Sequence, residues 1–423
     1  MKVFTTPRPA TWQTCIACGN ERLERDSAVR CQCGGLLTVR HRAPAWSGEA
    51  LRGLFQTRCC TRPDTIASGV WRFRELVLPT ARDEELITHP EGNTPLLQRE
   101  VVTRWAGVEE LFLKHEGHNP TGSFKDRGMT VGMTQAKRIG ARAVACASTG
   151  NTAASLGAYA AHAGLPALVL VPAGHTAAGK LVQTLAYGAR TLSVRGDFDQ
   201  CLRLLDQASE RLGVYLLNSI NPFRLEGQKT IVFELLQQLR WDPPDWIVLP
   251  AGNLGNLSAF GKALTEARDW GLIDRLPRLA GVQAEGAAPF ARGFAEGFRI
   301  RQRVKAETVA TAIRIGDPAS WDRAAQSIRE TDGVVLAVPD EEILAAKRVI
   351  DGAGVGCEPA SAASVAGLRR LTRDGTIRKG ETVVAVLTGH LLKDPDILRS
   401  SANQPVEIDP TIEAVEKVLS TGY

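Results

Sequence analysis

A chain of 423 residues is too long for one ordinary hydrophobic core, and its length predicts about two to three domains. Its composition is ordinary for a globular protein, with 44% hydrophobic residues, 23% charged residues and a formal net charge of +5. No stretch approaches the about 18 apolar residues of a membrane span, and the first residues lack the apolar core of a signal peptide. These patterns exclude a membrane-spanning protein and predict a cytoplasmic location.

The N-terminal segment carries a cysteine pattern that is typical of a metal site. The spacing is C-x2-C-x12-C-x-C, with a glycine after each pair, and the residues are Cys15, Cys18, Cys31 and Cys33. Two close thiolate pairs on tight turns suit tetrahedral zinc, so we expect a structural zinc ribbon within residues 1–43, with free thiols as the alternative. The remaining cysteines lack such spacing and are predicted to be buried or inert thiols: Cys59, Cys60, Cys146, Cys201 and Cys357.

The same end of the chain is basic. Residues 1–82 hold 13 Lys and Arg against 6 Asp and Glu. A zinc-ribbon module that binds nucleic acid therefore remains a remote alternative, although a basic surface is more often simply solvated.

The stretch NPTGSFKDRG at residues 119–128 places one lysine at the expected start of a helix. Pro120 and Gly122 interrupt the preceding chain, and Ser123 or Thr121 can cap the helix. At a helix N-terminus, and if also desolvated, Lys125 would have a lowered pKa and become a nucleophile near neutral pH. The alternative is an exposed lysine in a surface turn.

A short apolar run at residues 111–114 precedes the lysine turn, and after the helix further apolar runs alternate with helical segments. These later runs lie at residues 143–148, 167–172, 191–195, 214–218, 246–250, 279–285, 333–338 and 382–388. Nearly continuous apolar strands separated by helices indicate parallel sheets covered on both faces. We therefore expect an α/β protein with two such sheets.

Ligands of α/β sheets bind beyond the carboxyl ends of the strands, and three loops there are polar. The first holds hydroxyls and helix-start amides that suit a carboxylate, at residues 148–152. The second is the glycine-rich turn GNLGN at residues 252–256, which suits a phosphate but lacks the ending of a nucleotide loop. The third presents Thr388, whose hydroxyl suits a neutral ring nitrogen. With Lys125, these groups together describe a site for pyridoxal phosphate.

The motifs, taken in order, are similar to those of a known family. They include CxxCG, GVWRFRELVLP, EGNTPL, KHEGHNPTGSFKDRG, STGNTAAS, NPFRLEGQKT, PAGNLGN, GVQAEGAAP, EPASAAS and LTGHLLKD. The chain resembles the fold-type II pyridoxal-phosphate enzymes, whose fold is tryptophan synthase β-like, and within them the threonine synthases that carry an N-terminal zinc-ribbon-like segment. The resemblance covers nearly the whole chain.

The resemblance implies a role for each motif residue. Lys125 would bind the cofactor covalently, Asn151 would bond its 3′ oxygen, and Thr388 would bond its ring nitrogen. The cofactor phosphate would lie on Gly252, Asn253, Leu254, Gly255 and Asn256. The substrate carboxylate would lie on Ser148, Thr149 and Thr152, and the substrate phosphate on Asn218, Ser219 and Arg224.

The implied reaction converts O-phospho-L-homoserine and water to L-threonine and phosphate, in a homodimer. The implied domains are residues 1–43 for the ribbon, 44–132 with 216–423 for the large cofactor-binding domain, and 133–215 for the small domain. A β-replacing enzyme or a dehydratase acting on O-phosphoserine, serine or threonine is the main alternative. The chain departs from the family at Leu391, where glycine is usual, and we expect this side chain to narrow the pocket or alter its backbone.

Overall fold

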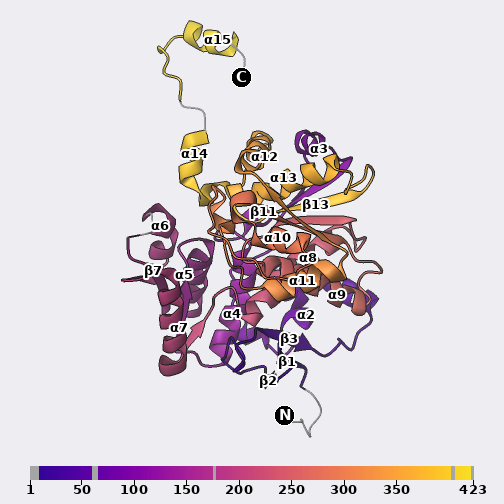
Figure 1. Ribbon diagram of the computed structural model, residues 1–423, viewed down its shortest axis with the longest axis vertical. Coiled ribbons are helices and arrows are strands. Elements are labelled where there is room, and N and C mark those ends of the chain that lie inside the picture. The colour runs from indigo at the N-terminus through magenta and orange to yellow at the C-terminus, as the bar shows by residue number, and fades with distance from the viewer. Residues whose placement is uncertain (1–8, 60–64, 175–177, 402–404, 421–423) are drawn as a thin grey trace.

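The computed structural model describes residues 9–59, 65–174, 178–401 and 405–420 (Figure 1). The strands form a three-stranded sheet in the order β2-β1-β3, a six-stranded sheet in the order β12-β11-β10-β13-β5-β4, and a four-stranded sheet in the order β8-β7-β6-β9. The strands are β1 Thr11–Cys15, β2 Glu21–Leu23, β3 Leu37–His41, β4 Leu96–Leu97, β5 Glu110–His115, β6 Ala143–Ala147, β7 Ala167–Pro172, β8 Arg190–Val194, β9 Val214–Leu216, β10 Trp246–Pro250, β11 Arg278–Ala284, β12 Val334–Val338 and β13 Thr382–Leu387.

The six-stranded sheet is parallel except for β4, which runs antiparallel to β5. Its central strand β10 is buried along its whole length. Ile247 and Leu249 pack into the apolar core on one face, and Trp246 and Val248 pack into the core on the other. This alternation explains why the strand is apolar at every position, as expected for a sheet covered on both faces.

The helices fall into groups according to the core they contribute to. The first face of the large sheet packs with α1 Gly48–Cys59, α2 Arg74–Val77, α8 Pro222–Gln238, α9 Gly255–Asp269, α10 Pro289–Ala295 and α11 Trp321–Glu330. The other face packs with α3 Glu100–Ala106, α12 Asp340–Gly352 and α13 Pro359–Arg373. The short 3-10 helices are η1 Thr65–Ala67, η2 Trp71–Phe73, η3 Asp83–Glu85, η4 Glu116–His118, η5 Glu285–Ala287, η6 Thr311–Ile313 and η7 Leu391–Lys393.

The four-stranded sheet is parallel throughout. It packs with α5 Asn151–Ala163, α6 Ala178–Ala186 and α7 Phe198–Leu212. Helix α4, Lys125–Arg138, contributes to both cores, because Met129 and Met133 pack with this sheet while Val131 packs with the large one. The helix that begins at Lys125 therefore lies between the two sheets.

The N-terminal ribbon, residues 11–41, is fastened to the body of the protein by buried polar contacts. The ring of His41 lies 2.7 Å from the carboxylate of Glu226 on α8. Lys262 on α9 donates to the carbonyl of Val39 at 2.6 Å and also contacts Glu226. These contacts fix the ribbon against α8 and α9.

The two predicted parallel sheets are confirmed, and each predicted apolar run overlaps a strand. The short strands β1 to β4 were not predicted individually. The tail forms α14 Pro395–Ser401 and α15 Ile412–Ser420, and Figure 1 shows α15 apart from the body of the fold. Within the described residues, none of the helices has the length and apolar character needed to cross a membrane.

Candidate active site

The turn at residues 119–124 delivers Lys125 to the first position of α4. Gly122 has a φ of +85°, a left-handed conformation that favours glycine. The hydroxyl of Ser123 accepts from the backbone N–H of Lys125 at 3.4 Å, as the sequence suggested. Thr121 instead bonds Asp126, which accepts its backbone N–H at 2.7 Å and its hydroxyl at 2.6 Å. The turn is therefore fixed by its own side chains.

The amine of Lys125 has an altered acidity. Burial, together with the positive charge of Arg224, lowers the pKa of Lys125 to about 7, while Glu358 acts in the opposite direction. The amine lies 3.7 Å from the centre of the Phe124 ring. A substantial fraction of this amine is therefore neutral and nucleophilic near pH 7.

A network of buried, paired charged side chains lies next to the same turn. The guanidinium of Arg127 bonds both carboxylate oxygens of Glu116, at 2.7 and 2.8 Å, and also bonds Glu234 at 2.8 Å. Glu234 in turn accepts from Lys114 at 2.6 Å and Arg72 at 3.0 Å. Opposite charges are thus paired inside the protein, which limits the cost of burying them.

The loop that carries Thr388 is paired with the lysine turn. The N–H of Phe124 donates to the carbonyl of Thr388 at 3.0 Å, and the N–H of His390 donates to the carbonyl of Gly122 at 2.9 Å. The hydroxyl of Thr388 is buried and lies 3.0 Å from that of Ser361. Two segments about 260 residues apart in sequence therefore meet through backbone hydrogen bonds, as expected for loops at the carboxyl ends of strands.

Leu391, the departure from the family pattern, begins the short helix η7 and lies near Gly356. A Cβ atom added to Gly356 would lie 3.2 Å from the Leu391 side chain. The structure thus places Leu391 against Gly356, and the backbone contacts of Thr388 remain in place.

The loop after β6 brings Asn151 to the start of α5. Its amide nitrogen lies 3.0 and 3.3 Å from the two carboxylate oxygens of Glu358. Ser148 and Thr149 are half-buried in the same loop, and Thr152 is half-buried in the first turn of α5. The hydroxyl of Ser148 accepts from the N–H of Gly150 at 3.2 Å. Within the described part of the chain, no hydrogen bond joins these three residues to Lys125.

The glycine-rich turn between β10 and α9 contains unusual backbone and unpaired groups. Leu254 has a φ of +64° directly before α9. Asn253 donates to the hydroxyl of Ser219 at 2.6 Å and accepts from the N–H of Ala319 at 2.7 Å. Both polar atoms of the buried Asn256 side chain lack a hydrogen-bond partner within the described residues. Since buried polar groups are almost always paired, an unpaired amide here fits a ligand group.

Gln228 adds a further buried polar group that sequence reasoning missed. It lies one turn along α8 from Arg224, and its carbonyl oxygen also has no partner in the described part of the chain. A Cβ atom added to Gly255 would lie 3.8 Å from that oxygen. Gln228 therefore borders the glycine-rich turn, but its place in the middle of a helical pattern gave no signal of this.

Arg224 lies in the first turn of α8 and is fully buried. Its Nη1 donates to the carbonyl of Leu217 at 3.0 Å, whereas its Nε and Nη2 have no partner among the residues that the structure describes. Burial lowers the pKa of Arg224 to about 10. Ser219 bonds Asn253 as above, and the side-chain oxygen of Asn218 accepts from the N–H of Ala147 at 3.0 Å. A buried cation without a carboxylate partner is suited to an anionic ligand.

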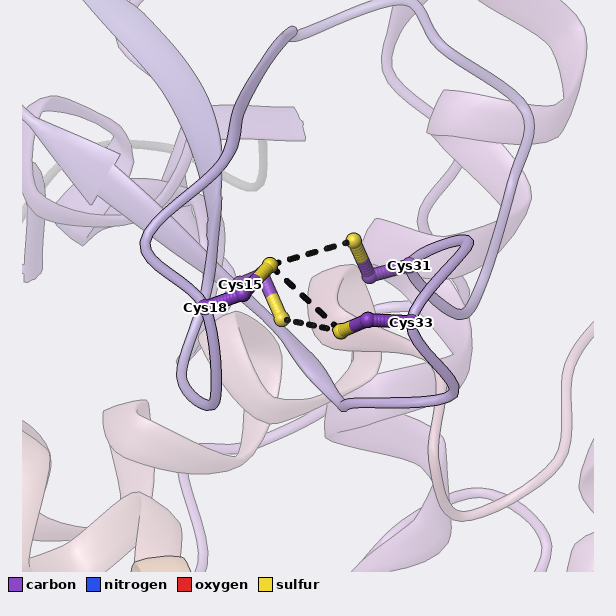
Figure 2. Close-up of side chains that lie close together, drawn as sticks. All are labelled: Cys15, Cys18, Cys31 and Cys33. Carbon is purple, nitrogen blue, oxygen red and sulfur yellow. Dashed lines mark hydrogen bonds between the residues drawn. The ribbon is translucent and has the colours of Figure 1, made fainter. Parts of the chain in front are cut away.

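The four N-terminal cysteines come together, as Figure 2 shows. Sulfur–sulfur distances are 3.5 Å for Cys15–Cys33, 3.7 Å for Cys18–Cys31 and 3.4 Å for Cys18–Cys33, and all four sulfurs lie within 4.8 Å of one another. Among the other cysteines, Cys146, Cys201 and Cys357 are buried as predicted. Cys59 is exposed at the end of α1, so of the two predicted options only an inert thiol remains for it, and Cys60 lies outside the described residues.

Comparisons with known proteins agree with this geometry. Residues 87–389 match the family described as pyridoxal-phosphate dependent enzyme. The fold is similar to that of threonine synthase from Escherichia coli (TM-score 0.74, 19% identity, 97% of this chain and 100% of that chain covered). It is also similar to that of maize serine racemase (TM-score 0.64, 21% identity, 78% and 95% covered). These matches define fold type II of the pyridoxal-phosphate enzymes.

Two relatives match over nearly their whole lengths. A threonine synthase from Methanosarcina acetivorans is 46% identical over 408 residues, covering 96% of this chain and 98% of that protein. A threonine synthase from Methanocaldococcus jannaschii is 42% identical over 415 residues, covering 96% and 99%. The chain therefore belongs to the pyridoxal-phosphate-dependent enzymes and, within them, to the threonine synthase family.

Proposed function

We propose that this chain converts O-phospho-L-homoserine and water to L-threonine and phosphate. The observation that carries the proposal is Arg224, a buried arginine with two unpaired nitrogen atoms whose charge helps to lower the pKa of Lys125. An anion site and a nucleophilic amine thus lie within electrostatic reach of each other, as a phosphorylated amino-acid substrate requires.

Several residues fit pyridoxal phosphate as the cofactor. Lys125 would hold it covalently, and the turn at residues 252–256 would hold its phosphate, where the unpaired amide of Asn256 supports the assignment. Asn151 would face its ring oxygen and Thr388 its ring nitrogen. When bound, the cofactor supplies an electron-withdrawing ring that stabilises negative charge on the substrate carbon atoms.

The substrate would be held at both ends. The hydroxyls of Ser148, Thr149 and Thr152 would bind its carboxylate, while Asn218, Ser219 and Arg224 would bind its phosphate. The amine of Lys125, with a pKa of about 7, would move protons at Cα, Cβ and Cγ. The phosphate leaves from Cγ and water adds at Cβ, which gives threonine.

A dehydratase or a β-replacing enzyme would use the same lysine and the same glycine-rich turn. Arg224 separates the possibilities, because serine and threonine carry no phosphate to pair with it. O-Phosphoserine does carry one, but its phosphate lies one carbon nearer the amine.

The test is purified protein loaded with pyridoxal phosphate. We expect a visible absorption band that Lys125→Ala abolishes, and turnover of phosphohomoserine that exceeds turnover of phosphoserine, serine and threonine. Arg224→Gln should raise KM for phosphohomoserine more than it lowers kcat. Preferred turnover of serine, or unchanged kinetics in Arg224→Gln, would reject the substrate assignment.

We also propose that the four-cysteine cluster binds one structural zinc ion. Sulfurs placed about 2.3 Å from a tetrahedral zinc ion lie nearly 4 Å apart, close to the distances of 3.4 to 3.7 Å here. Metal analysis should find about one zinc per chain, lost in Cys18→Ser. The homodimer, the cytoplasmic location and the domain boundaries stay predictions.

A further inference from the structure

Glu358 is a buried carboxyl group for which the family motifs suggested no role. It directly precedes α13 and is 4% exposed. Its carboxylate lies 3.0 Å from the amide nitrogen of Asn151 and 3.5 Å from the hydroxyl of Thr388. It also acts electrostatically on Lys125. One carboxyl group thus contacts two of the residues assigned to the cofactor ring and influences the third.

The contact with Asn151 has a definite direction. The amide of Asn151 turns its nitrogen, and not its oxygen, toward Glu358. Burial raises the pKa of Glu358, whereas this hydrogen bond and the nearby charge of Lys125 favour the ionised form, which accepts hydrogen bonds and donates none. Both short distances involve this one nitrogen. One N–H can serve the carboxylate while the second remains for another acceptor. Glu358 thereby determines which way round the Asn151 amide is held.

The position of the carboxyl is itself set by Gly389. The N–H of Glu358 donates to the carbonyl of Gly389 at 3.1 Å. A Cβ atom added to Gly389 would lie 2.4 Å from a carboxylate oxygen of Glu358, closer than any ordinary contact. Gly389 does not have a left-handed φ, so its backbone would accept alanine and the obstacle is the Glu358 carboxyl.

We infer that Glu358 is a positioning residue, which acts through Asn151 to present the free N–H of that amide to the ring oxygen of the cofactor. The inference rests on the proposed function, in which Asn151 faces that ring oxygen. Groups behind a binding residue commonly fix its orientation in this manner.

The first test is a double-mutant cycle on the affinity of the full chain for pyridoxal phosphate, measured by fluorescence quenching. Glu358→Ala and Asn151→Ala should each weaken binding by about tenfold, the effect of losing one hydrogen bond that involves a charged group. The double variant should be no weaker than Asn151→Ala alone. Glu358→Gln, which still offers an acceptor oxygen, should bind within about threefold of the wild type and keep the shape of its visible absorption band.

The second test disturbs Glu358 without replacing it. Gly389→Ala should reproduce the weaker binding of Glu358→Ala, but it should add nothing in the Glu358→Ala background, where the obstructing carboxyl is gone. Gly352→Ala is the matched control, because a Cβ atom there meets nothing within 4 Å. It should bind pyridoxal phosphate as the wild type does.

The outcomes separate this inference from the proposed function. The role of Glu358 would be overturned if the double variant bound pyridoxal phosphate more weakly than Asn151→Ala alone. An altered absorption band in Glu358→Gln would overturn it as well. Neither result would affect the proposed reaction. A wild-type protein that does not bind pyridoxal phosphate would reject the proposed function itself. Binding of the cofactor without turnover of phosphohomoserine would reject only the assigned substrate.

Discussion

Replacing Arg224 with methionine should weaken phosphate recognition without weakening the fold. Burial lowers the pKa of Arg224 from an ordinary 12.5 to about 10, and each pH unit of that difference corresponds to about 1.4 kcal/mol. The folded state therefore holds the charged side chain at a cost of about 3.5 kcal/mol, because the pKa is lowered by about 2.5 pH units. Because a lowered pKa of a base disfavours its protonated form, the full cost applies at every pH below about 10.

Methionine removes that cost but also removes one hydrogen bond from a charged donor, Nη1 to the carbonyl of Leu217, which contributes about 2 kcal/mol. Imperfect packing of the methionine side chain would lower the free energy of unfolding by about 1 kcal/mol more. The expected balance is a free energy of unfolding equal to that of the wild type or about 1 kcal/mol higher, in phosphate-free buffer.

The assay is thermal unfolding of cofactor-loaded protein, with inorganic phosphate added against a chloride control of equal ionic strength. Loading with the cofactor fills its own phosphate site, so added phosphate reports on the substrate side. A ligand at 100 times its Kd stabilises by about 2.7 kcal/mol, so the wild-type Tm should rise with phosphate. Arg224→Met should lose this rise.

Arg323→Met is the matched control. Arg323 on α11 is also buried with two unpaired nitrogen atoms and a pKa lowered to about 10, but it faces the ribbon, where it donates to Leu37. This variant should keep the phosphate response. A Tm of Arg224→Met far below that of the wild type, or an unchanged response to phosphate, would refute the reasoning.

Three further predictions concern Lys125, the contact between helices α4 and α8, and the cysteine cluster. Covalent attachment of pyridoxal phosphate should accelerate as pH rises through about 7, where Lys125 loses its proton, and then level off; acceleration continuing to pH 10 would contradict this. Gly227→Ala would place a Cβ atom 1.8 Å from the carbonyl oxygen of Arg127, so it should cost about 3 kcal/mol or more and lower the soluble yield and the Tm. Gly35→Ala would place a Cβ atom 2.7 Å from the sulfur of Cys15, so zinc measured by metal analysis should fall below one per chain.

The sequence predicted the two sheets well because strands buried on both faces must be apolar at nearly every position. Strand β10 is an example, since all five of its residues are buried. The approach of the Thr388 loop to the lysine turn also followed, because parallel strands place their carboxyl ends at one edge of a sheet. Periodicity and topology together were enough to gather most of the candidate site.

The polar network beneath the site could not be predicted in the same way. Arg127 and Glu234 look like ordinary surface charges on helices, since Arg and Glu are rarely fully buried. Only the three-dimensional structure pairs them at 2.8 Å. Glu358 was missed for a related reason, because a glutamate before a proline is easily taken for the ordinary start of a helix. Sequence patterns identify residues that face a ligand more readily than they identify the buried residues that hold such ligand-facing side chains in position.

On helix α8, hydrogen-bond pairing distinguishes the polar side chains that stabilise the fold from those that are available to a ligand. Every residue from Pro222 to Gln237 is buried, so each polar side chain on it must find a partner or pay for its desolvation. Glu226 pairs with His41 and Lys262 and so fastens the ribbon, and Glu234 pairs within the network below the lysine turn. Within the described residues, Arg224, Gln228 and Gln237 retain unpaired polar atoms. Gln237 lies at the far end of the helix, whereas Arg224 and Gln228 lie one turn apart near the glycine-rich turn. The helix that anchors the ribbon thus also brings two unpaired polar groups to the proposed anion site.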